Sequence, residues 1–494
     1  MSDKTKHRQL GAQDAQFVYS QTPSNLTHVM AVSVFAPPRA SKTYDPYARV
    51  LKLVGERLHV SPVFRRKLHR APMDIDHPYW VEDEHFDLEA HITHSKLPRP
   101  ATWEAFTTEI SRHFSRPMDL HRPLWDIHVL EGIDQVDDMA PGSFAVIQRV
   151  HHSATDGMGM TRLLASLSDS DAKGTPLMPL EAASEDELGQ RPATGALLRR
   201  SLRNIVSAPL RMGRSLAGFA PEIMASARNS RSGVPHDEPD QKIPETRFNG
   251  GVSPHKLFDG LVFPLEDFKT IKSAVAGATV NDAVLAVTGG ALRAYLKKHN
   301  ELPEAPLVAW CPVNVSTDPE QGAPGANNLS GMSVAIGTGI ADPMERLTSI
   351  RAATASAKAA ESGVGARMIT ELTQHIPSAG MAGLARLMSN ESFAPRFCNL
   401  FVSNVPGSPV PQYMAGAKCS HQFGLAPLGN GMGLFIAVGS YNGKLVFNII
   451  SDRKILPDME FFRQCLQASH LELLEAAKKG KQAKKAKRAK KAPE

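Results

Sequence analysis

Residues 144–167 read FAVIQRVHHSATDGMGMTRLLASL, and they form the most informative segment of this 494-residue chain. The run FAVIQRV is apolar enough for a buried strand, and the run MTRLLASL has the apolar spacing of a helix. Two adjacent histidines and an Asp-Gly pair lie between these runs, in what we predict to be a tight turn. A strand that passes through a short turn into a helix is typical of α/β proteins, so we predict a mixed α/β fold.

Strand and helix patterns alternate in the same way along most of the chain. Period-two alternation or short apolar runs predict strands at Met30–Phe35, Leu124–Leu130, Phe144–Val150, Leu307–Val315, Gly331–Thr338, Phe397–Val405, Gly433–Tyr441 and Lys444–Ile450. Helical periodicity predicts helices at Asp45–Leu58, Trp103–Phe114, Met160–Leu167, Val280–Lys298 and Pro343–Ala360. The stretch from Asp171 to about Pro254 is rich in Pro, Gly, Ser and charged residues, which is the composition of a linker. We therefore predict an N-terminal domain at 1–170, a linker at 171–250, a C-terminal domain at 251–477 and a disordered Lys-rich tail at 478–494.

The composition excludes several classes of protein. With 42% hydrophobic and 21% charged residues, most of the chain should fold rather than remain disordered. The N-terminus lacks the apolar run of a secretory signal, and no stretch of about 18 apolar residues could span a membrane. The four cysteines have neither zinc-ligand nor disulfide spacing, which fits a reducing compartment. We therefore expect a cytoplasmic protein.

The net charge of +6 is concentrated at the C-terminus. Residues 478–494 hold nine basic residues and one acidic residue, so the rest of the chain is slightly acidic. This tail fits a solubilising segment or one that is attracted to an anionic lipid surface. No aromatic residue is interleaved with the lysines for stacking on bases, so we predict no nucleic-acid partner.

A second basic segment lies within the predicted linker. Residues 194–221 contain no acidic residue, several apolar residues on one helical side, and five arginines: Arg199, Arg200, Arg203, Arg211 and Arg214. A helix of this kind could lie on a membrane surface, or it could pack its apolar side on one of the domains. Pro209 must end or kink this helix.

The two histidines of the central turn are the candidate acid–base residues. Because neighbouring residues of a strand point to opposite faces, only one of His151 and His152 can face a given cleft. A neutral imidazole with a pKa of about 6.5 can take a proton from a hydroxyl or an amine and return it to a leaving group. Asp156 could cap the following helix or pair with an arginine, and Gly157 leaves room for a substrate or a neighbouring backbone. The turn therefore predicts one acting histidine and one supporting histidine.

Metal binding is the competing interpretation of this turn. The opposed directions of the two histidines suit chelation poorly, and no third histidine or cysteine lies at ligand spacing nearby. We therefore predict no metal site and no bound cofactor.

Five sequence blocks resemble known acyltransferases. HHxxxDG, residues 151–157, is the signature of the CoA-dependent acyltransferases with the chloramphenicol-acetyltransferase-like fold. Together with it, four further blocks resemble the bacterial wax ester synthase/diacylglycerol acyltransferase family, in the family's order: WVEDEHFDL at Trp80–Leu88, Pro123-Leu124-Trp125, Asn281-Asp282 within TVNDAVLA, and SNVPG beginning with Ser403-Asn404. The resemblance extends from about residue 10 to about residue 470.

The resemblance implies two chloramphenicol-acetyltransferase-like domains, each a mixed sheet with helices, with an active-site channel at their interface. It implies transfer of a fatty acyl group from acyl-CoA to a long-chain alcohol or to diacylglycerol. His152 would be the general base, His151 and Asp156 would hold the shape of the motif, and Asn281 and Asp282 would support the site from the second domain.

The other blocks have structural interpretations as well. Asn281 could be the N-cap of the helix that follows it. Pro123-Leu124-Trp125 and Ser403-Asn404 are candidate substrate-binding residues, although the first block also fits the packed start of a strand and the second fits a structural turn near CoA-facing loops.

Two rival functions use the same features differently. A non-enzymatic coat of lipid droplets would explain the linker arginines and the lysine tail but not the HHxxxDG turn. An acyltransferase for an amine or a small alcohol would keep the motif and the fold while changing the acceptor. On the preferred interpretation, the protein associates peripherally with the inner membrane or with lipid inclusions, and its oligomeric state is open.

Overall fold

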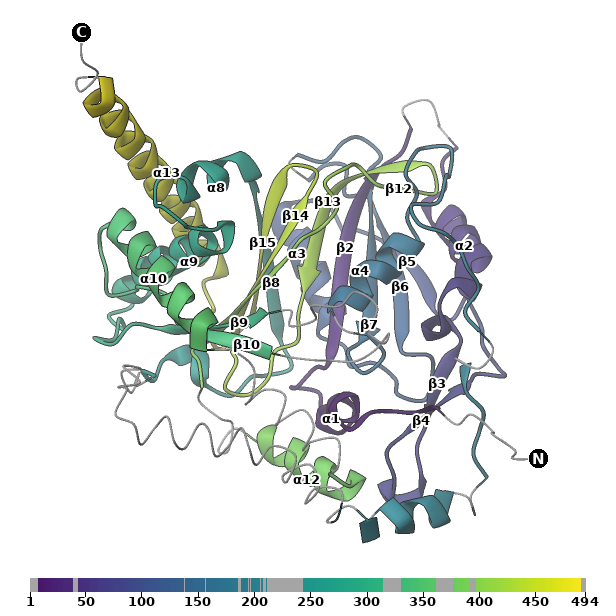
Figure 1. Cartoon of the computed structure of the whole chain (residues 1–494). Helices are drawn as coiled ribbons and strands as arrows, with labels where there is room; N and C mark the ends of the chain where they lie inside the picture. The colour runs from purple at the N-terminus through teal and green to yellow at the C-terminus, as the bar shows by residue number, and fades with distance from the viewer. Residues whose placement is uncertain are drawn as a thin grey trace.

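Over the residues that it describes, the computed structural model contains two six-stranded sheets, a smaller three-stranded sheet, and helices packed against the sheets (Figure 1). In the small sheet, β4 (Tyr79–Glu82) lies between β1 (Arg8–Gln9) and β3 (Arg66–His69). The structure describes residues 8–38, 43–136, 138–155, 157–184, 188–193, 195, 197–204, 206, 207, 210, 243–313, 330–360, 376–390 and 397–489.

The first six-stranded sheet has the order β12-β13-β2-β7-β6-β5. Its strands are β2 (His28–Ala36), β5 (Ile92–Lys96), β6 (Trp125–Glu131), β7 (Phe144–His151), β12 (Tyr413–Met414) and β13 (Ala417–Leu425). The pairing of β5 with β6 is parallel, and the other pairings are antiparallel. Apolar residues on alternate positions of these strands contact α3 on one face, and α1, α2 and α4 on the other: α1 (Ala12–Ser20), α2 (Pro46–Arg57), α3 (Trp103–Phe114) and α4 (Gly157–Ser166).

The second six-stranded sheet has the order β10-β9-β11-β14-β15-β8 and is mixed. Its strands are β8 (Lys256–Pro264), β9 (Val308–Val313), β10 (Ser330–Ala335), β11 (Leu400–Val405), β14 (Leu434–Tyr441) and β15 (Lys444–Asp452). The helices of this half are α8 (Leu265–Lys272), α9 (Val280–Lys298), α10 (Pro343–Ala360), α12 (Ser378–Met388) and α13 (Met459–Ala489). Among the helices that the structure describes, none combines the length and hydropathy needed to cross a bilayer.

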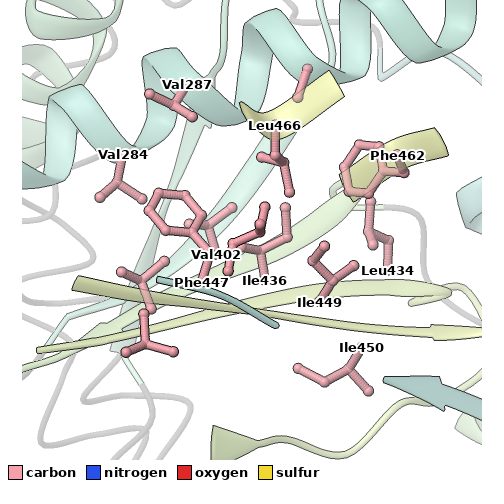
Figure 2. Close-up of a cluster of buried hydrophobic side chains, with 14 of the residues drawn as sticks. Val284, Val287, Val402, Leu434, Ile436, Phe447, Ile449, Ile450, Phe462 and Leu466 are labelled. Atoms are coloured by element: carbon pink, nitrogen blue, oxygen red, sulfur yellow. The ribbon is translucent and has the colours of Figure 1, made fainter. Parts of the chain in front are cut away.

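The core of the second half lies between its sheet and the helices α9 and α13. Figure 2 shows Ile436 and Phe447 of the sheet facing Val284 of α9 and Leu466 of α13. These side chains are completely buried, so each removes most of its apolar surface from water. This core holds α9 firmly against the sheet.

The two halves of the chain share one sheet. β13 comes from the C-terminal half but pairs with β2 of the N-terminal sheet, from Lys418 opposite Ala36 to Leu425 opposite Met30. A second contact links the two halves: the Ser111 hydroxyl of α3 accepts a hydrogen bond from the backbone N–H of Phe258 on the edge strand β8, at 2.9 Å. The two halves of the chain are therefore connected through this sheet, because each half completes part of the other.

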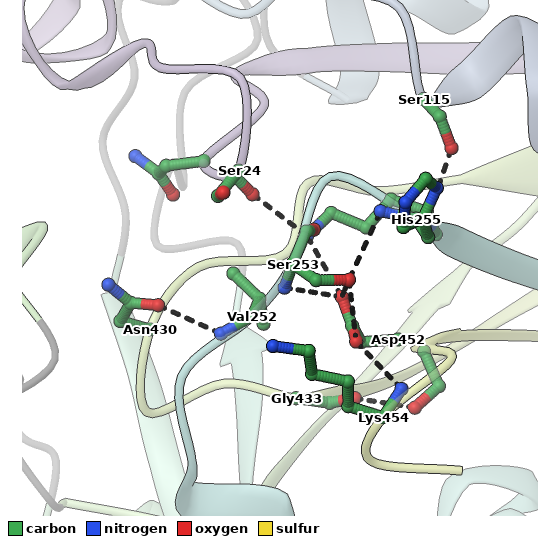
Figure 3. A network of polar contacts seen from close by, with 12 residues as sticks. Ser24, Ser115, Val252, Ser253, His255, Asn430, Gly433, Asp452 and Lys454 are labelled. Atoms are coloured by element: carbon green, nitrogen blue, oxygen red, sulfur yellow. Dashed lines mark hydrogen bonds and ion pairs between the residues drawn. The ribbon is translucent and has the colours of Figure 1, made fainter. Parts of the chain in front are cut away.

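A buried ion pair lies where the two halves of the chain meet. Lys256 Nζ lies 3.6 Å from Asp452 Oδ2, both side chains are fully buried, and the same ammonium donates to the backbone oxygen of Ser24 in the N-terminal half at 2.8 Å. Asp452 also accepts hydrogen bonds from the N–H and hydroxyl of Ser253, as Figure 3 shows. Burial lowers the pKa of Lys256 to about 8. Removal of one partner would leave the other charge buried and uncompensated.

The predicted strands and helices are present, with small shifts at their ends, and α3, α9 and α10 have the predicted bounds. The last two residues of the predicted strand Leu307–Val315 lie outside the described residues. Sequence patterns missed several elements, among them α1, β8 and β13. The prediction of a disordered tail from residue 478 is wrong as far as Ala489, because α13 continues to that residue.

Candidate active site

His151 and His152 lie where β7 ends, and backbone hydrogen bonds fix this end to both neighbouring strands. The His151 N–H donates to Leu124 O at 3.0 Å, just before β6. The His152 N–H donates to Thr27 O at 2.8 Å, just before β2. The histidine pair is therefore held at the end of an interior strand of the sheet rather than on a free loop.

The side chain of His151 is fully buried and hydrogen-bonded through both ring nitrogens. Nε2 lies 2.8 Å from the Thr27 hydroxyl, and Nδ1 lies 2.7 Å from the Ser153 hydroxyl. The backbone N–H of Ser153 also donates to Nδ1, at 3.2 Å. Because Nδ1 accepts this hydrogen bond, the proton of the neutral ring lies on Nε2 and is donated to Thr27. Burial, and then the nearby His152, lower the pKa of His151 to about 3, so this ring stays neutral.

His152 has a different environment. Its side chain is half-buried, and its ring stacks on Phe17 of α1 with centroids 4.3 Å apart and planes at 19°. The aromatic contact fixes the plane of the imidazole while leaving part of the residue exposed. His152 is therefore the more accessible of the two residues, and the assignment of one acting and one supporting histidine stays a prediction.

The remainder of the HHxxxDG motif leads into α4, which begins at Gly157. Asp156 lies outside the described residues, so its predicted capping or ion-pairing role stays a prediction. Ser153 is buried, with 2% exposure, so its hydroxyl is poorly accessible to a bulky thioester.

The Pro123-Leu124-Trp125 block supports this site from β6. Leu124 and Trp125 are buried, and Trp125 pairs with Val150 of β7. The indole N–H of Trp125 donates to Phe64 O at 3.0 Å, and its ring stacks on His91. These contacts match the packed start of a strand, next to the backbone that carries the histidines.

Asn281 and Asp282 lie in the first turn of α9, in the other half of the chain. The N-cap of this helix is Thr279, so the prediction that Asn281 caps it is wrong. Thr279 and Asp282 form a capping box, in which the Thr279 N–H donates to Asp282 Oδ2 at 2.7 Å and the Asp282 N–H donates to the Thr279 hydroxyl at 3.2 Å. Asp282 Oδ1 accepts from Thr354 of α10 at 2.7 Å. The described contacts of Asp282 are thus structural.

Ser403 and Asn404 lie within β11 and pair with β14, so this part of the SNVPG block is strand rather than turn. The chain leaves the strand at the following Pro-Gly pair. A Cβ on Gly407 would lie 2.1 Å from Ser440 O, so a close backbone approach requires glycine here.

Glu109, His113 and His128 form a buried group of potential metal ligands, with atoms within 4.8 Å of one another. Their existing contacts explain the group without an ion. Arg112 binds both carboxylate oxygens of Glu109, and the two ring nitrogens of His128 lie 2.8 Å from the hydroxyls of Thr93 and Ser95. The guanidinium would also repel a cation, so these residues fit a polar joint between α3 and the sheet better than a metal site.

A surface hollow of about 560 Å³ lies at the opposite end of the sheet from the histidines. It is lined by residues 44–47 at the start of α2, by residues 94–96 of β5, and by Glu131. In the sheet, β5 and β6 reach this hollow at their C-terminal ends, whereas β6 begins beside the histidine turn. The hollow therefore does not belong to the candidate active site.

Comparison with known proteins identifies the family. The catalytic domain of wax ester synthase/diacylglycerol acyltransferases matches residues 10–284, and the C-terminal domain of the same family matches residues 325–475. The chain belongs to the wax ester synthase/diacylglycerol acyltransferase family. It is therefore an acyltransferase, as the sequence blocks predicted.

Individual relatives agree with this assignment. Two Mycobacterium tuberculosis proteins that carry the name diacylglycerol O-acyltransferase are 29% identical over 470 residues (95% of this chain, 90% of the relative) and 30% identical over 487 residues (92% and 94%). The wax ester synthase/diacylglycerol acyltransferase of Marinobacter aquaeolei VT8 has a similar structure, with a TM-score of 0.66, 25% identity, and coverage of 95% of this chain and 99% of that one. The first condensation domain of the calcium-dependent antibiotic synthetase shares the fold, with a TM-score of 0.55, 13% identity, and coverage of 95% and 97%.

Phe17 and Thr27 are the site residues that sequence reasoning missed. Phe17 lies on a nine-residue helix too short for a clear periodic pattern, and Thr27 is one polar residue before a strand. Thr27 can be placed beside His151 only once the pairing of β2 with β7 is known, because that pairing sets His28 opposite His151.

Proposed function

We propose that this acyltransferase moves a fatty acyl group from acyl-CoA to the hydroxyl of a long-chain alcohol or of diacylglycerol, with His152 as the general base. The observation that supports the proposal is the contrast between the two histidines. His151 is kept neutral by burial and is hydrogen-bonded to Thr27 and Ser153, whereas His152 is partly exposed and stacked on Phe17.

The proposed reaction proceeds in one transfer step. His152 removes the proton from the acceptor hydroxyl as the oxygen attacks the thioester carbon, and the carbon–sulfur bond then breaks. The same proton passes to the departing CoA thiolate, so an ester and CoA-SH are formed without an acyl-enzyme. The backbone amides at the start of α4 are candidate donors for the oxyanion that forms during the attack.

The acceptor is proposed from the family and from the relatives' names. The names of the Mycobacterium tuberculosis relatives favour diacylglycerol, whereas the family name also includes wax ester synthase, which implies a long-chain alcohol, so both acceptors belong in the test. The basic and apolar surface segments favour a protein that works at the inner membrane or at lipid inclusions. The droplet-coat alternative gives no role to the histidine pair, so we place it behind the enzyme.

The experiment follows CoA release from palmitoyl-CoA by the purified full chain, with hexadecanol, diacylglycerol, a long-chain amine or a short alcohol as acceptor. We expect release to be stimulated by hexadecanol or by diacylglycerol. In His152→Ala, turnover should fall by about 10²-fold or more, since general-base catalysis typically contributes about 10²–10⁴ in rate. The control is His121→Ala, which removes an exposed imidazole outside this site.

The outcomes separate the alternatives. A folded His152→Ala variant with the wild-type rate would disprove the assignment of the base. Stimulation by the amine or the short alcohol alone would keep the acyltransferase and replace the acceptor. Absence of stimulation by any acceptor would contradict the proposed reaction.

A further inference from the structure

A helical segment of the N-terminal half is attached to the protein by polar contacts together with the buried Leu197, which is 2% exposed. Residues 197–204 are helical, and the Ser201 hydroxyl donates to the backbone oxygen of Ile75. Arg200 donates to the side-chain oxygen of Gln9 at 3.1 Å, and its guanidinium lies 5.5 Å from the centre of the Tyr79 ring. A surface helix normally turns most of its apolar residues inward, whereas Leu197 is the one buried leucine among the described residues of this segment.

The apolar side of the segment faces outward. Leu198, Leu202, Val206 and Leu210 are between 53% and 72% exposed. Residues four apart lie on the same side of a helix, so the first three form one stripe along the described helical residues. A contiguous exposed apolar stripe marks a surface that contacts another body.

The helix α12 adds a second outward apolar patch. Its buried residues, including Met381 and Ala385, pack in the same core as α1, while Leu384 and Leu387 are 42% and 47% exposed. Figure 1 shows α12 and the short helix at residues 197–207 along the same lower side of the molecule.

The two helices are anchored to the same short loop. The Ser378 hydroxyl at the start of α12 donates to Asp74 O at 2.7 Å, and the segment that precedes α12 lies within hydrogen-bond distance of His77 through Ile376 O, at 3.1 Å. The Ser201 contact with Ile75 reaches this loop as well. We call the six exposed residues of the two helices the leucine face: Leu198, Leu202, Val206, Leu210, Leu384 and Leu387.

Positive charge accompanies the leucine face. Arg199 and Arg203 are exposed beside the leucines of the first helix, and Arg386 is exposed on α12. The sequence contains no Asp or Glu at residues 188–221 or within α12. Apolar side chains among arginines, without acidic residues, are the pattern of a helix that lies at an anionic lipid surface.

The leucine face is close to the catalytic turn. α12 packs against α1, and α1 carries Phe17, whose ring stacks on His152. A lipid surface on the leucine face would therefore hold a water-insoluble acceptor one helix layer from the base.

We propose that the leucine face docks the protein on an anionic phospholipid surface and presents the membrane-held acceptor to His152. This docking adds a lipid-binding surface to the proposed function, and it rests on that function for the identity of the acceptor. The apolar side chains enter the interfacial layer, and the arginines bind lipid phosphates from either side.

The test measures flotation of the full chain with vesicles of phosphatidylcholine alone or with phosphatidylglycerol added. We expect binding to the anionic vesicles, and a loss of at least about tenfold in the partition coefficient for the double variant Leu198→Ser/Leu202→Ser, because burial of each leucine contributes more than the free energy of a tenfold change. Arg199→Gln/Arg203→Gln should lose binding mainly to the anionic vesicles. The matched control is Leu471→Ser, which removes an exposed leucine from α13.

The acyl-transfer assay distinguishes this proposal from the proposed function. With the acceptor dispersed in detergent micelles, the leucine variants should keep the wild-type rate, whereas with the acceptor in vesicles their rate should fall with binding. Vesicle binding that is unchanged in the leucine variants would overturn the docking surface and would leave the lysines of α13 as the lipid contact. Conversion of a dimer to a monomer by these variants, without loss of vesicle binding, would assign the leucine face to a second copy of the chain and would equally overturn the proposal. If the wild type binds vesicles and the leucine variants do not, but no acyl transfer is measured, the docking is supported and only the proposed function is contradicted.

Discussion

The substitution Thr27→Val tests the hydrogen bonds that hold His151. Valine has nearly the shape of threonine, so the change removes the hydroxyl beside His151 Nε2 without opening a large cavity. In the neutral ring the proton lies on Nε2, because Nδ1 already accepts the backbone N–H of Ser153. Thr27→Val therefore leaves a buried N–H donor without its acceptor.

The expected loss of unfolding free energy follows from this difference between the two ring nitrogens of His151. An unsatisfied buried donor costs about 1–3 kcal/mol of unfolding free energy. Ser153→Ala removes the other hydroxyl, but Nδ1 keeps the backbone N–H at 3.2 Å, so its cost should be the smaller of the two, about 0.5–1.5 kcal/mol. Thr27→Ser keeps the hydroxyl and removes only a methyl group, and serves as the control.

Urea unfolding followed by circular dichroism measures these differences, provided that the m-value stays constant across the variants. Catalysis should respond less than stability, because Thr27 holds His152 through its backbone oxygen, which valine also provides. A Ser153→Ala variant that is destabilised more than Thr27→Val would refute the assignment of the proton to Nε2.

Two further predictions concern acid stability and helix packing. The pKa of His151 in the folded protein, about 3, lies below the unfolded value of about 6.5. Its contribution to the free energy of unfolding is therefore complete above pH 6.5, and it is lost by about 1.4 kcal/mol per pH unit as the pH falls towards 3. Urea titrations between pH 7 and pH 5 should show a shallower pH dependence for His151→Gln than for the wild type; equal slopes would contradict the low pKa. Gly289→Ala should lower the melting temperature, because the added Cβ would lie 1.9 Å from Ile336 O, whereas Gly383→Ala on α12 meets no atom within 4 Å and should raise it slightly. Equal melting temperatures for the two variants would show that α9 can move away from the Ile336 carbonyl.

Local sequence patterns predicted the parts of the fold that depend on local periodicity. The helices at Trp103–Phe114 and Val280–Lys298 have their predicted bounds because the apolar spacing and the capping residues lie within each segment. β13 was missed because a bulge between Cys419 and His421 interrupts the alternation of its buried residues.

The candidate site was predictable where one motif carries it. HHxxxDG placed the histidine pair at the end of a strand, and the resemblance selected His152 as the base. The supporting residues Phe17 and Thr27 come from segments more than 120 residues earlier in the chain, and only the pairing of β2 with β7 brings Thr27 to the site. The outward direction of Leu198, Leu202, Val206 and Leu210 was equally out of reach, because it depends on contacts of Arg200 and Ser201 with distant residues.

The strand that the C-terminal half contributes to the first sheet also constrains how the chain can be made. During synthesis, residues 417–425 emerge long after β2, β6 and β7, so β2 remains an open sheet edge while most of the polypeptide is still being translated. Pairing over such a long sequence separation generally slows folding, and an unpaired strand edge is a general site for aggregation. A gene fragment that stops before residue 417 encodes an N-terminal half with an unfinished edge, and recovery of a soluble enzyme from split halves requires that the second piece be present while the first one folds.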